Sequence, residues 1–87
     1  MSPENAGSPV SRVRLFAALR ELAGASEVEA GGATVAEVVA ELSERFGEKF
    51  AAIAGAGSVV VDGERASPGR PLSGREEVAI LPPVSGG

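Results

Sequence analysis

The chain has no cysteine and no histidine among its 87 residues. Without cysteine there are no disulfides, thiolate metal ligands or cysteine nucleophiles. Without histidine, the commonest general base and the commonest metal ligand are both missing. These absences exclude an independent hydrolase triad and a zinc site. We therefore expect no metal, no bound cofactor and no enzymatic activity of the chain on its own.

Aromatic residues are also scarce, at 3% of the chain, although hydrophobic residues make up 44%. The length allows one domain near the lower limit for an unaided hydrophobic core. That core must be built from valine, leucine, isoleucine and alanine, together with Phe16, Phe46 and Phe50.

Positive charge is in the minority, with a formal net charge of -4. Nucleic-acid binding needs a basic face, so a nucleic-acid partner is not expected. No apolar run approaches the length of a membrane span, and residues 1–9 lack both a basic start and an apolar segment. We interpret residues 1–9 as a disordered leader and expect a cytoplasmic protein.

The C-terminal stretch has three distinct parts. Val78 to Leu81 is a short apolar run of strand length. Pro82 and Pro83 cannot donate to a ladder, so the strand must end there and continue as a stiff, extended stalk. Ser85-Gly86-Gly87 follows, and glycine permits close approach of a second backbone. This pattern predicts a carboxylate that enters a partner's narrow active site, whereas the alternative is a frayed end.

The first third of the chain predicts a hairpin with a helical turn in its connection. Residues 10–17 alternate, which places Val13, Leu15 and Ala17 on one face and Phe16 on the other with two arginines. Residues 18–23 have helix formers and precede a glycine suited to a C-cap. A second short strand is expected over residues 26–30.

Thr34 opens the clearest helix. Thr34 and Glu37 form a capping box, and Gly47 is placed to end the helix in a left-handed conformation. The apolar residues recur at helical spacing and predict a core-facing stripe. They are Val35, Val38, Val39, Leu42 and Phe46.

The remaining segments predict a short turn, a hairpin and the final strand. Residues 48–54 are expected to add one helical turn, and residues 55–58 to form a loop that lacks the features of a phosphate cradle. Asp62-Gly63 is a strong hairpin signal between residues 58–61 and 64–66. A proline- and glycine-rich connection, anchored by Leu72, leads to the last strand.

This order predicts an α+β, β-grasp (ubiquitin-like) fold. One main helix and a short extra helix pack on a mixed sheet of four to five strands, whose first and last strands are parallel at the centre. The β-grasp domain is expected over residues 10–83, followed by a flexible tail over residues 84–87.

Two stretches resemble the MoaD/ThiS family of sulfur carriers. Residues 16–24, Phe-Ala-Ala-Leu-Arg-Glu-Leu-Ala-Gly, resemble the start of the family's members, and Pro71-Leu72 with residues 77–87 resembles their end. The Pro-Pro-Val-Ser-Gly-Gly ending is most similar to the molybdopterin synthase small subunits. Gly74-Arg75-Glu76 departs from the Asp-Gly-Asp turn common in the family.

The resemblance implies a function in which Gly87 is the reactive residue. A MoeB-like adenylyltransferase would use ATP to adenylate the Gly87 carboxylate, and a sulfur donor enzyme would convert it to a thiocarboxylate. A MoaE-like large subunit of molybdopterin synthase would then receive the tail and the sulfur. Gly86 would permit threading, while Pro82 and Pro83 would keep the tail extended. The resemblance implies a heterotetramer for the complex, and we expect the free carrier to be a monomer.

The candidates for contact with the partner are Phe16, Pro82, Pro83, Val84 and Ser85. Val84 and Ser85 lie beyond the expected fold, and Val84 has little of its own domain to pack against. Phe16 is either a contact residue or ordinary packing beneath the short helix. The competing functions are a carrier for thiamine or cysteine biosynthesis, a ubiquitin-like protein modifier, and a passive interaction domain with an inert tail.

Overall fold

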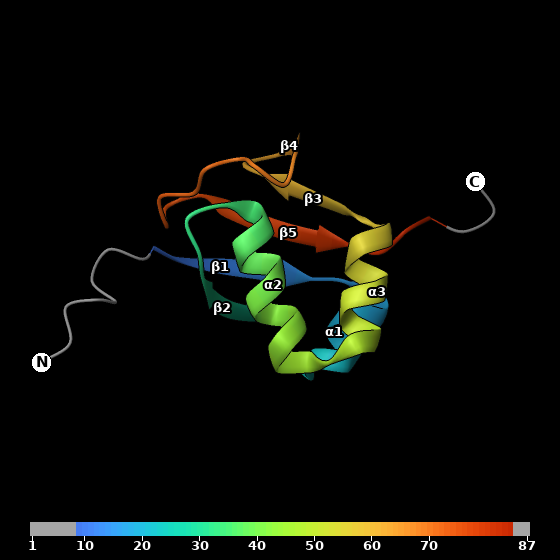
Figure 1. Cartoon of the computed structure of the whole chain (residues 1–87). Helices are drawn as coiled ribbons and strands as arrows, with labels where there is room; N and C mark the ends of the chain where they lie inside the picture. The colour runs from blue at the N-terminus through green and yellow to red at the C-terminus, as the bar shows by residue number, and fades with distance from the viewer. Residues whose placement is uncertain (1–8, 85–87) are drawn as a thin grey trace, which may run out of the picture.

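The first and last strands of the chain lie side by side at the centre of one mixed sheet. The computed structural model describes residues 9–84. Its strands are β1 (Val10–Leu15), β2 (Glu27–Gly31), β3 (Ser58–Val61), β4 (Glu64–Ala66) and β5 (Glu77–Leu81). They form one five-stranded sheet in the order β2-β1-β5-β3-β4. Only β1 and β5 pair in parallel, whereas the other neighbours are antiparallel, as the β-grasp prediction requires (Figure 1).

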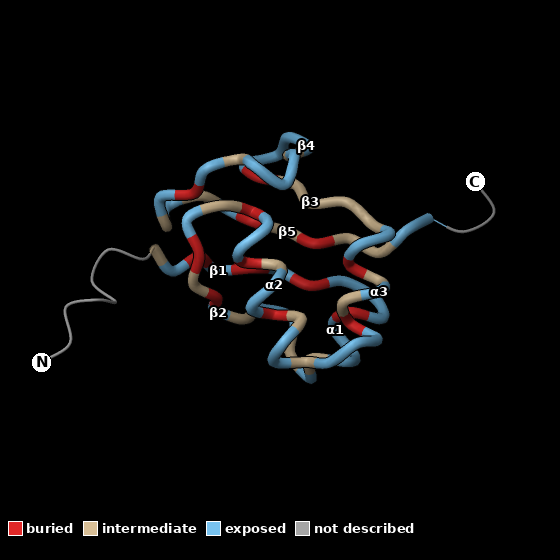
Figure 2. Tube along the Cα trace, in the orientation of Figure 1, coloured by how far each residue is buried: buried red, intermediate tan, exposed pale blue. Residues whose placement is uncertain are grey.

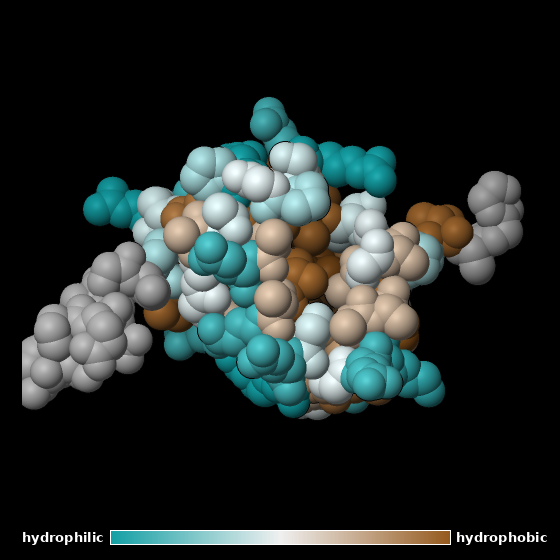
Figure 3. Space-filling model, in the orientation of Figure 1, coloured by the Kyte–Doolittle hydropathy of each residue, from teal (hydrophilic) through white to brown (hydrophobic). Residues whose placement is uncertain are grey.

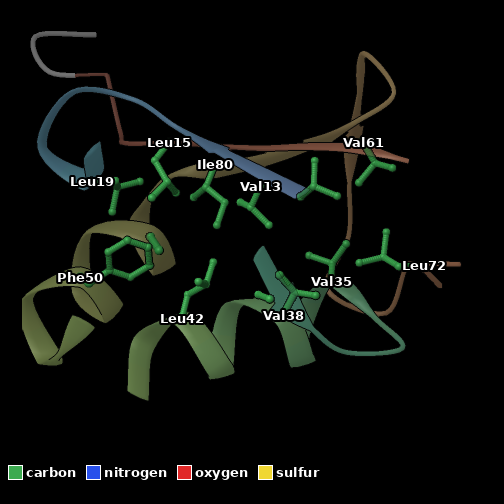
Figure 4. Packing of buried hydrophobic residues seen from close by; sticks show 13 residues of the cluster. Val13, Leu15, Leu19, Val35, Val38, Leu42, Phe50, Val61, Leu72 and Ile80 are labelled. Carbon is green, nitrogen blue, oxygen red and sulfur yellow. The ribbon is translucent and has the colours of Figure 1, made fainter. Parts of the chain in front are cut away.

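The helices pack on one face of this sheet. They are α1 (Ala17–Ala23), α2 (Val35–Phe46) and α3 (Glu48–Ala56). Side chains from the helices, including Leu19, Leu42 and Phe50, point toward Leu15 and Ile80 of the central strands (Figure 4). All five of these side chains are fully buried. Burial of one such side chain stabilises the fold by about 1.5–3 kcal/mol, so this layer holds the sheet to the helices.

The alternation of β1 matches the prediction up to Leu15. Ser11, Val13 and Leu15 are buried, while the residues between them are exposed (Figure 2). The expectation that the strand continues to Ala17 is wrong. Ala17 begins α1 with a φ of 53° and is exposed, because Phe16 is already the N-cap of that helix. The short helix itself and its left-handed C-cap at Gly24 are confirmed.

The capping box of α2 is present as predicted. The Thr34 hydroxyl accepts a hydrogen bond from the Glu37 amide at 3.2 Å, and the Glu37 carboxylate accepts one from the Ala33 amide at 2.8 Å. The first bond satisfies an amide that the first turn leaves without a helical partner, whereas the second ties Glu37 back to Ala33, the residue before the N-cap. The stripe is confirmed with Val35, Val38 and Leu42 buried. Gly47 ends the helix at positive φ but not in the left-handed helical region.

The segment after α2 is more helical than predicted. Residues 48–56 form the nine-residue helix α3, so the expected loop at residues 55–58 is reduced to Gly57 between α3 and β3. Phe50 is fully buried, and its ring lies 5.4 Å from that of Phe46. Burial of Phe50 against the sheet favours helix here despite the glycine at position 55.

The β3–β4 hairpin turn and the connection from β4 to β5 match their sequence signals. Asp62 and Gly63 both have positive φ, as the tight hairpin between β3 and β4 requires. Leu72 is buried and its amide donates to Ala33, which fixes the connection beneath α2. Of the expected leader, residues 1–8 lie outside the described residues.

Candidate functional site

The base of the candidate site is β5, the central strand from which the C-terminal segment leaves the fold. Val78 and Ile80 are 1% and 0% exposed and point into the core. The strand is held by ladders on both sides, parallel to β1 and antiparallel to β3. The starting point of the C-terminal segment is therefore one of the most constrained parts of the molecule.

The segment changes from buried to exposed within a few residues. Leu81 still pairs with Ser58 of β3, and Leu81 and Pro82 are half-buried. Pro82 cannot donate a ladder hydrogen bond, so the sheet ends there. Pro83 is exposed and the side chain of Val84 is 87% exposed (Figure 2). The segment therefore leaves the fold beside the end of α3 (Figure 1).

The predicted reactive end lies beyond this stalk. Ser85, Gly86 and Gly87 lie outside the described residues. Their roles, and those of Pro82, Pro83 and Val84 in partner binding, stay predictions. What the structure adds is that Val84 makes little contact with its own domain, which leaves its side chain accessible.

Phe16 belongs to the face of the sheet opposite the helices. It continues the outward positions of β1, after Arg12 and Arg14, and its side chain is 38% exposed. The sequence left open whether Phe16 packs beneath α1 or contacts a partner. Its exposure shows that α1 does not cover it fully, and its role in binding stays a prediction.

Apolar and positively charged side chains are combined on this open face. Arg14 lies opposite Ala79 of β5, and Ala79 lies opposite Val60 of β3, which in turn pairs with Arg65 of β4. Residues directly opposite each other in neighbouring strands project to the same face. Ala79 and Val60 are half-buried, whereas both arginines are exposed. The row therefore has an apolar centre between Arg14 and Arg65, and Glu27 of β2 lies opposite Arg14 at its outer end.

The charges beside this row, on β1 and β2, are largely solvated. Arg12 and Glu27 form an ion pair at 3.5 Å, with side chains 75% and 46% exposed. Such an exposed pair contributes little to stability. It borders an open polar depression of about 440 Å³ that also includes Arg14, Arg75 and Glu77. Acidic and basic groups alternate there, so the depression has no single sign of charge that would select an ion.

Glu76 organises the turn where the sequence departs from the family pattern. Its carboxylate accepts hydrogen bonds from the amides of Ser73 and Gly74, at 3.0 and 3.2 Å, and from the Ser73 hydroxyl at 3.1 Å. Hydrogen bonds from its own backbone amide and from Ser73 lower the pKa of Glu76, because they stabilise the ionised form. Glu76 thus closes the turn that leads into β5.

The sequence interpretation missed Gly57. Its backbone lies so close to Leu81 that a Cβ at this position would overlap the Leu81 carbonyl oxygen. The sequence signal was a glycine directly before a strand, but this pattern was interpreted as part of a loop. The close approach involves a distant strand, so only the tertiary structure reveals it.

The described residues assemble no catalytic or metal centre. Within residues 9–84, no group of three or more potential ligands lies close enough together to hold a metal ion. An apolar hollow of about 460 Å³ lies on the helix side, between α2, α3 and β3 (Figure 3). Its lining consists mainly of small side chains such as Ala36, Ala40 and Ala54, which supply no acid–base pair. None of the helices in the described part is long and apolar enough to cross a membrane.

The fold and its projecting C-terminal segment define a ubiquitin-like protein of the β-grasp class. Residues 13–87 match the ThiS family. The chain therefore belongs to the ThiS/MoaD family, as the two resembling stretches indicated. No curated protein matches the chain by sequence.

Solved structures with the same fold span several members of this family. The small archaeal modifier protein 1 from Methanosarcina acetivorans is similar with a TM-score of 0.81 and 28% identity, over 92% of this chain and 98% of that one. A putative molybdopterin converting factor subunit 1 from Pyrococcus furiosus is 32% identical, with a TM-score of 0.75, over 88% of this chain and 100% of that one.

A third similar structure comes from a complex. A chain in the BexX/CysO complex of Amycolatopsis orientalis is 26% identical, with a TM-score of 0.73, over 88% of this chain and 99% of that one. The three structures carry names from different pathways. The likeness therefore establishes the ubiquitin-like sulfur carrier or modifier fold and leaves the pathway to a separate argument.

Proposed function

We propose that this chain is the sulfur carrier for molybdopterin synthesis, and that the carboxylate of Gly87 is its reactive group. The observation that carries the proposal is the C-terminal segment. It starts from the central strand β5, passes through Pro82 and Pro83, and presents Val84 almost fully to solvent. The family match extends along this segment as far as residue 87.

From this chain, the proposed chemistry needs only a nucleophile and a segment that can extend into the partner's active site. A carboxylate oxygen of Gly87 attacks the α-phosphorus of ATP in the partner, pyrophosphate leaves, and an acyl-adenylate forms. A sulfur nucleophile at the oxidation level of hydrosulfide then attacks the acyl carbon, and AMP leaves. The product is a thiocarboxylate at Gly87. The acid–base groups that assist these steps belong to the partner enzymes, because this chain has no histidine or cysteine.

The fold contributes to this chemistry by fixing the segment before it binds. Pro82 and Pro83 restrict the backbone in the free protein, which reduces the conformational entropy lost on entering a partner's channel. The partners that this function requires are a MoeB-like adenylyltransferase, a sulfur donor enzyme and a MoaE-like large subunit. The ATP is bound and used by the adenylyltransferase.

The intact mass of the protein tests this function. The full-length chain is incubated with its cognate adenylyltransferase, ATP and a sulfur donor, beside a matched chain that lacks Gly87. We expect the mass gain of one sulfur replacing one oxygen in the full-length chain alone. An unchanged mass with an adenylyltransferase shown to be active on another carrier would refute the proposal.

The pathway is decided by a second assay with the product of the first. Thiocarboxylated carrier is mixed with the MoaE-like large subunit and a pterin precursor, and in parallel with thiazole- and cysteine-forming enzymes. We expect sulfur transfer to the pterin, because the Pro-Pro-Val-Ser-Gly-Gly ending resembles the molybdopterin synthase small subunits and a converting factor subunit is 32% identical. Transfer only in a parallel reaction would assign the carrier to that pathway instead.

The similarity to a small archaeal modifier protein favours one second candidate, covalent protein modification. In that case the activated Gly87 would form isopeptide bonds with lysines of other proteins. Peptide mass spectrometry of a cell extract would detect lysines that carry the C-terminal residues of this chain. Such conjugates, lost when Gly87 is deleted, would support the modifier function.

A further inference from the structure

The junction between α3 and β3 lies directly against the start of the C-terminal segment. α3 ends at Ala56, and the Gly57 amide donates to the Ala54 carbonyl at 3.2 Å. The next residue, Ser58, begins β3 and pairs with Leu81, the last residue of β5. Gly57 is therefore one residue before the last pair of the ladder that holds the segment.

The two backbones approach too closely at this point for any side chain. A Cβ at Gly57 would overlap the Leu81 carbonyl oxygen and lie 3.0 Å from the Leu81 carbonyl carbon and 3.1 Å from that of Pro82. These are backbone atoms of Leu81 in the central strand and of Pro82 just after it, so they cannot move aside as the end of a long side chain can. At Gly55, two residues earlier and within α3, a Cβ would meet nothing within 4 Å. At the end of α3, the close approach to the C-terminal segment is therefore found at position 57 and not at position 55.

The contact with Gly57 lies at the residues where the C-terminal segment leaves the sheet. Leu81 and Pro82 are the half-buried residues at the end of the strand, and Pro83 and Val84 beyond them are exposed. An extended proline segment rises about 3 Å per residue, so Val84 lies about 6 Å beyond Pro82. A tilt of about 10° at Pro82 would thus displace Val84 by about 1 Å. Misplacement of the reacting groups on that scale can reduce a rate about 100-fold, and we expect a smaller loss here because Gly87 is three residues beyond Val84.

We propose that Gly57 is a positioning residue for the reactive C-terminus. Its missing side chain lets the α3–β3 junction pack against the backbone of Leu81 and Pro82, and this contact fixes the angle at which the segment leaves the sheet. The consequence for sulfur transfer rests on the proposed function, whereas the consequence for the direction of the segment does not.

The structural part of the inference is that the segment is held to the sheet at Pro82. It can be tested on the wild-type protein without any partner. Residual dipolar couplings are measured for Cα–H of Pro82 and Pro83 and compared with couplings from the five strands. We expect the Pro82 coupling to fit the alignment of the sheet. If it averages toward zero, Pro82 is not held by the junction and the inference is overturned, whatever the variants do.

Three glycine-to-alanine variants test the functional part of the inference, which is that Gly57 positions the C-terminus for reaction. Gly57→Ala introduces the clash beside the segment, and Gly55→Ala makes the same chemical change in open space. Gly32→Ala is a control for instability, because its Cβ would lie 2.8 Å from the Val38 amide nitrogen, in a different part of the fold from Leu81. All are compared with wild type at a temperature where far-UV circular dichroism shows them folded. The readout is kcat and KM for ATP–pyrophosphate exchange with the cognate adenylyltransferase.

We expect Gly57→Ala to lower kcat/KM about tenfold, mainly through kcat, because the tail still docks but presents its carboxylate poorly. Gly55→Ala and Gly32→Ala should match wild type. A wild-type kcat/KM in Gly57→Ala, or an equal loss of kcat/KM in Gly32→Ala, would overturn the inference. If wild type itself supports no exchange, the proposed function fails, and the dipolar couplings alone decide whether the segment is held to the sheet at Pro82.

Discussion

Ile80 and Val84 belong to one continuous C-terminal segment but to opposite environments. Ile80 is 0% exposed and sits in the central strand of the sheet, whereas Val84 is 87% exposed. Both are β-branched apolar residues, so residue type does not explain the difference. Pro82, which cannot extend the ladder, separates the two regions. The comparison shows how one stretch can both close the core and present an exposed side chain on the way to the proposed reactive end.

The two regions have different physical tasks. β5 needs buried surface and hydrogen bonds on both sides, because it holds β1 and β3 together. In the proposed function, the segment after Pro82 enters a partner, which requires accessibility and a defined direction. A substitution on one side of Pro82 should therefore change stability, and a substitution on the other side should change binding.

The largest expected effect is on stability, from Ile80→Ala. Truncation of a fully buried isoleucine leaves a cavity, so we expect a loss of about 2–5 kcal/mol in the free energy of unfolding. Chemical denaturation monitored by circular dichroism measures it. Val84→Ala is the matched control and should change stability by less than about 0.5 kcal/mol. A similar loss of stability in both variants would mean that Val84 packs on its own domain. The contrast between the environments of Ile80 and Val84 would then be wrong.

A smaller effect is expected on binding, from Val84→Asp. The exposed apolar side chain is proposed to enter an apolar partner surface, where a carboxylate would have to be desolvated. We expect affinity for the MoaE-like large subunit to fall about tenfold, equivalent to about 1.4 kcal/mol, with unchanged unfolding. Isothermal titration calorimetry measures the affinity. Wild-type affinity in the variant would remove Val84 from the proposed interface.

The smallest effect is expected for Glu76→Gln, at the turn that leads into β5. The folded-state pKa of Glu76 is lowered, so ionised Glu76 stabilises the fold above its unfolded pKa, and this contribution is lost as the pH falls through the folded pKa. We expect the variant to be slightly less stable at neutral pH and to lose less stability on acidification.

Thermal unfolding across a pH series measures this difference between the two proteins. Glu77→Gln is a suitable control, because it makes the same chemical change at the next, exposed residue. If Glu76→Gln and wild type lose stability in parallel from neutral to acidic pH, the hydrogen bonds at Ser73 and Gly74 do not stabilise the ionised form.

Local signals in the sequence predicted the parts of the fold that depend on local interactions. The start of α2 follows from Thr34 and Glu37, whose hydrogen bonds lie within the first turn. The hairpin at Asp62-Gly63 follows from the positive φ that both residues adopt. The parallel pairing of β1 and β5 followed from the element order and the apolar final strand.

The parts that failed depend on tertiary contacts. α3 extends to Ala56 although the sequence indicated one turn, because Phe50 and Ala54 are buried against the core. Ala17 adopts positive φ where α1 begins directly after β1, a geometry that alternation along a strand does not reveal. For the candidate site, the sequence predicted the stalk and the exposure of Val84. It missed Gly57, whose importance depends on Leu81 in another strand.

The central claim is that the fold and the reactive end are separable on either side of Pro82. The most direct test measures two quantities on one sample of the chain lacking Gly87: its free energy of unfolding, and its yield of thiocarboxylate in the sulfur-transfer reaction. We predict wild-type stability and no thiocarboxylate. Wild-type yield without Gly87, or a large loss of stability on its removal, would contradict the claim.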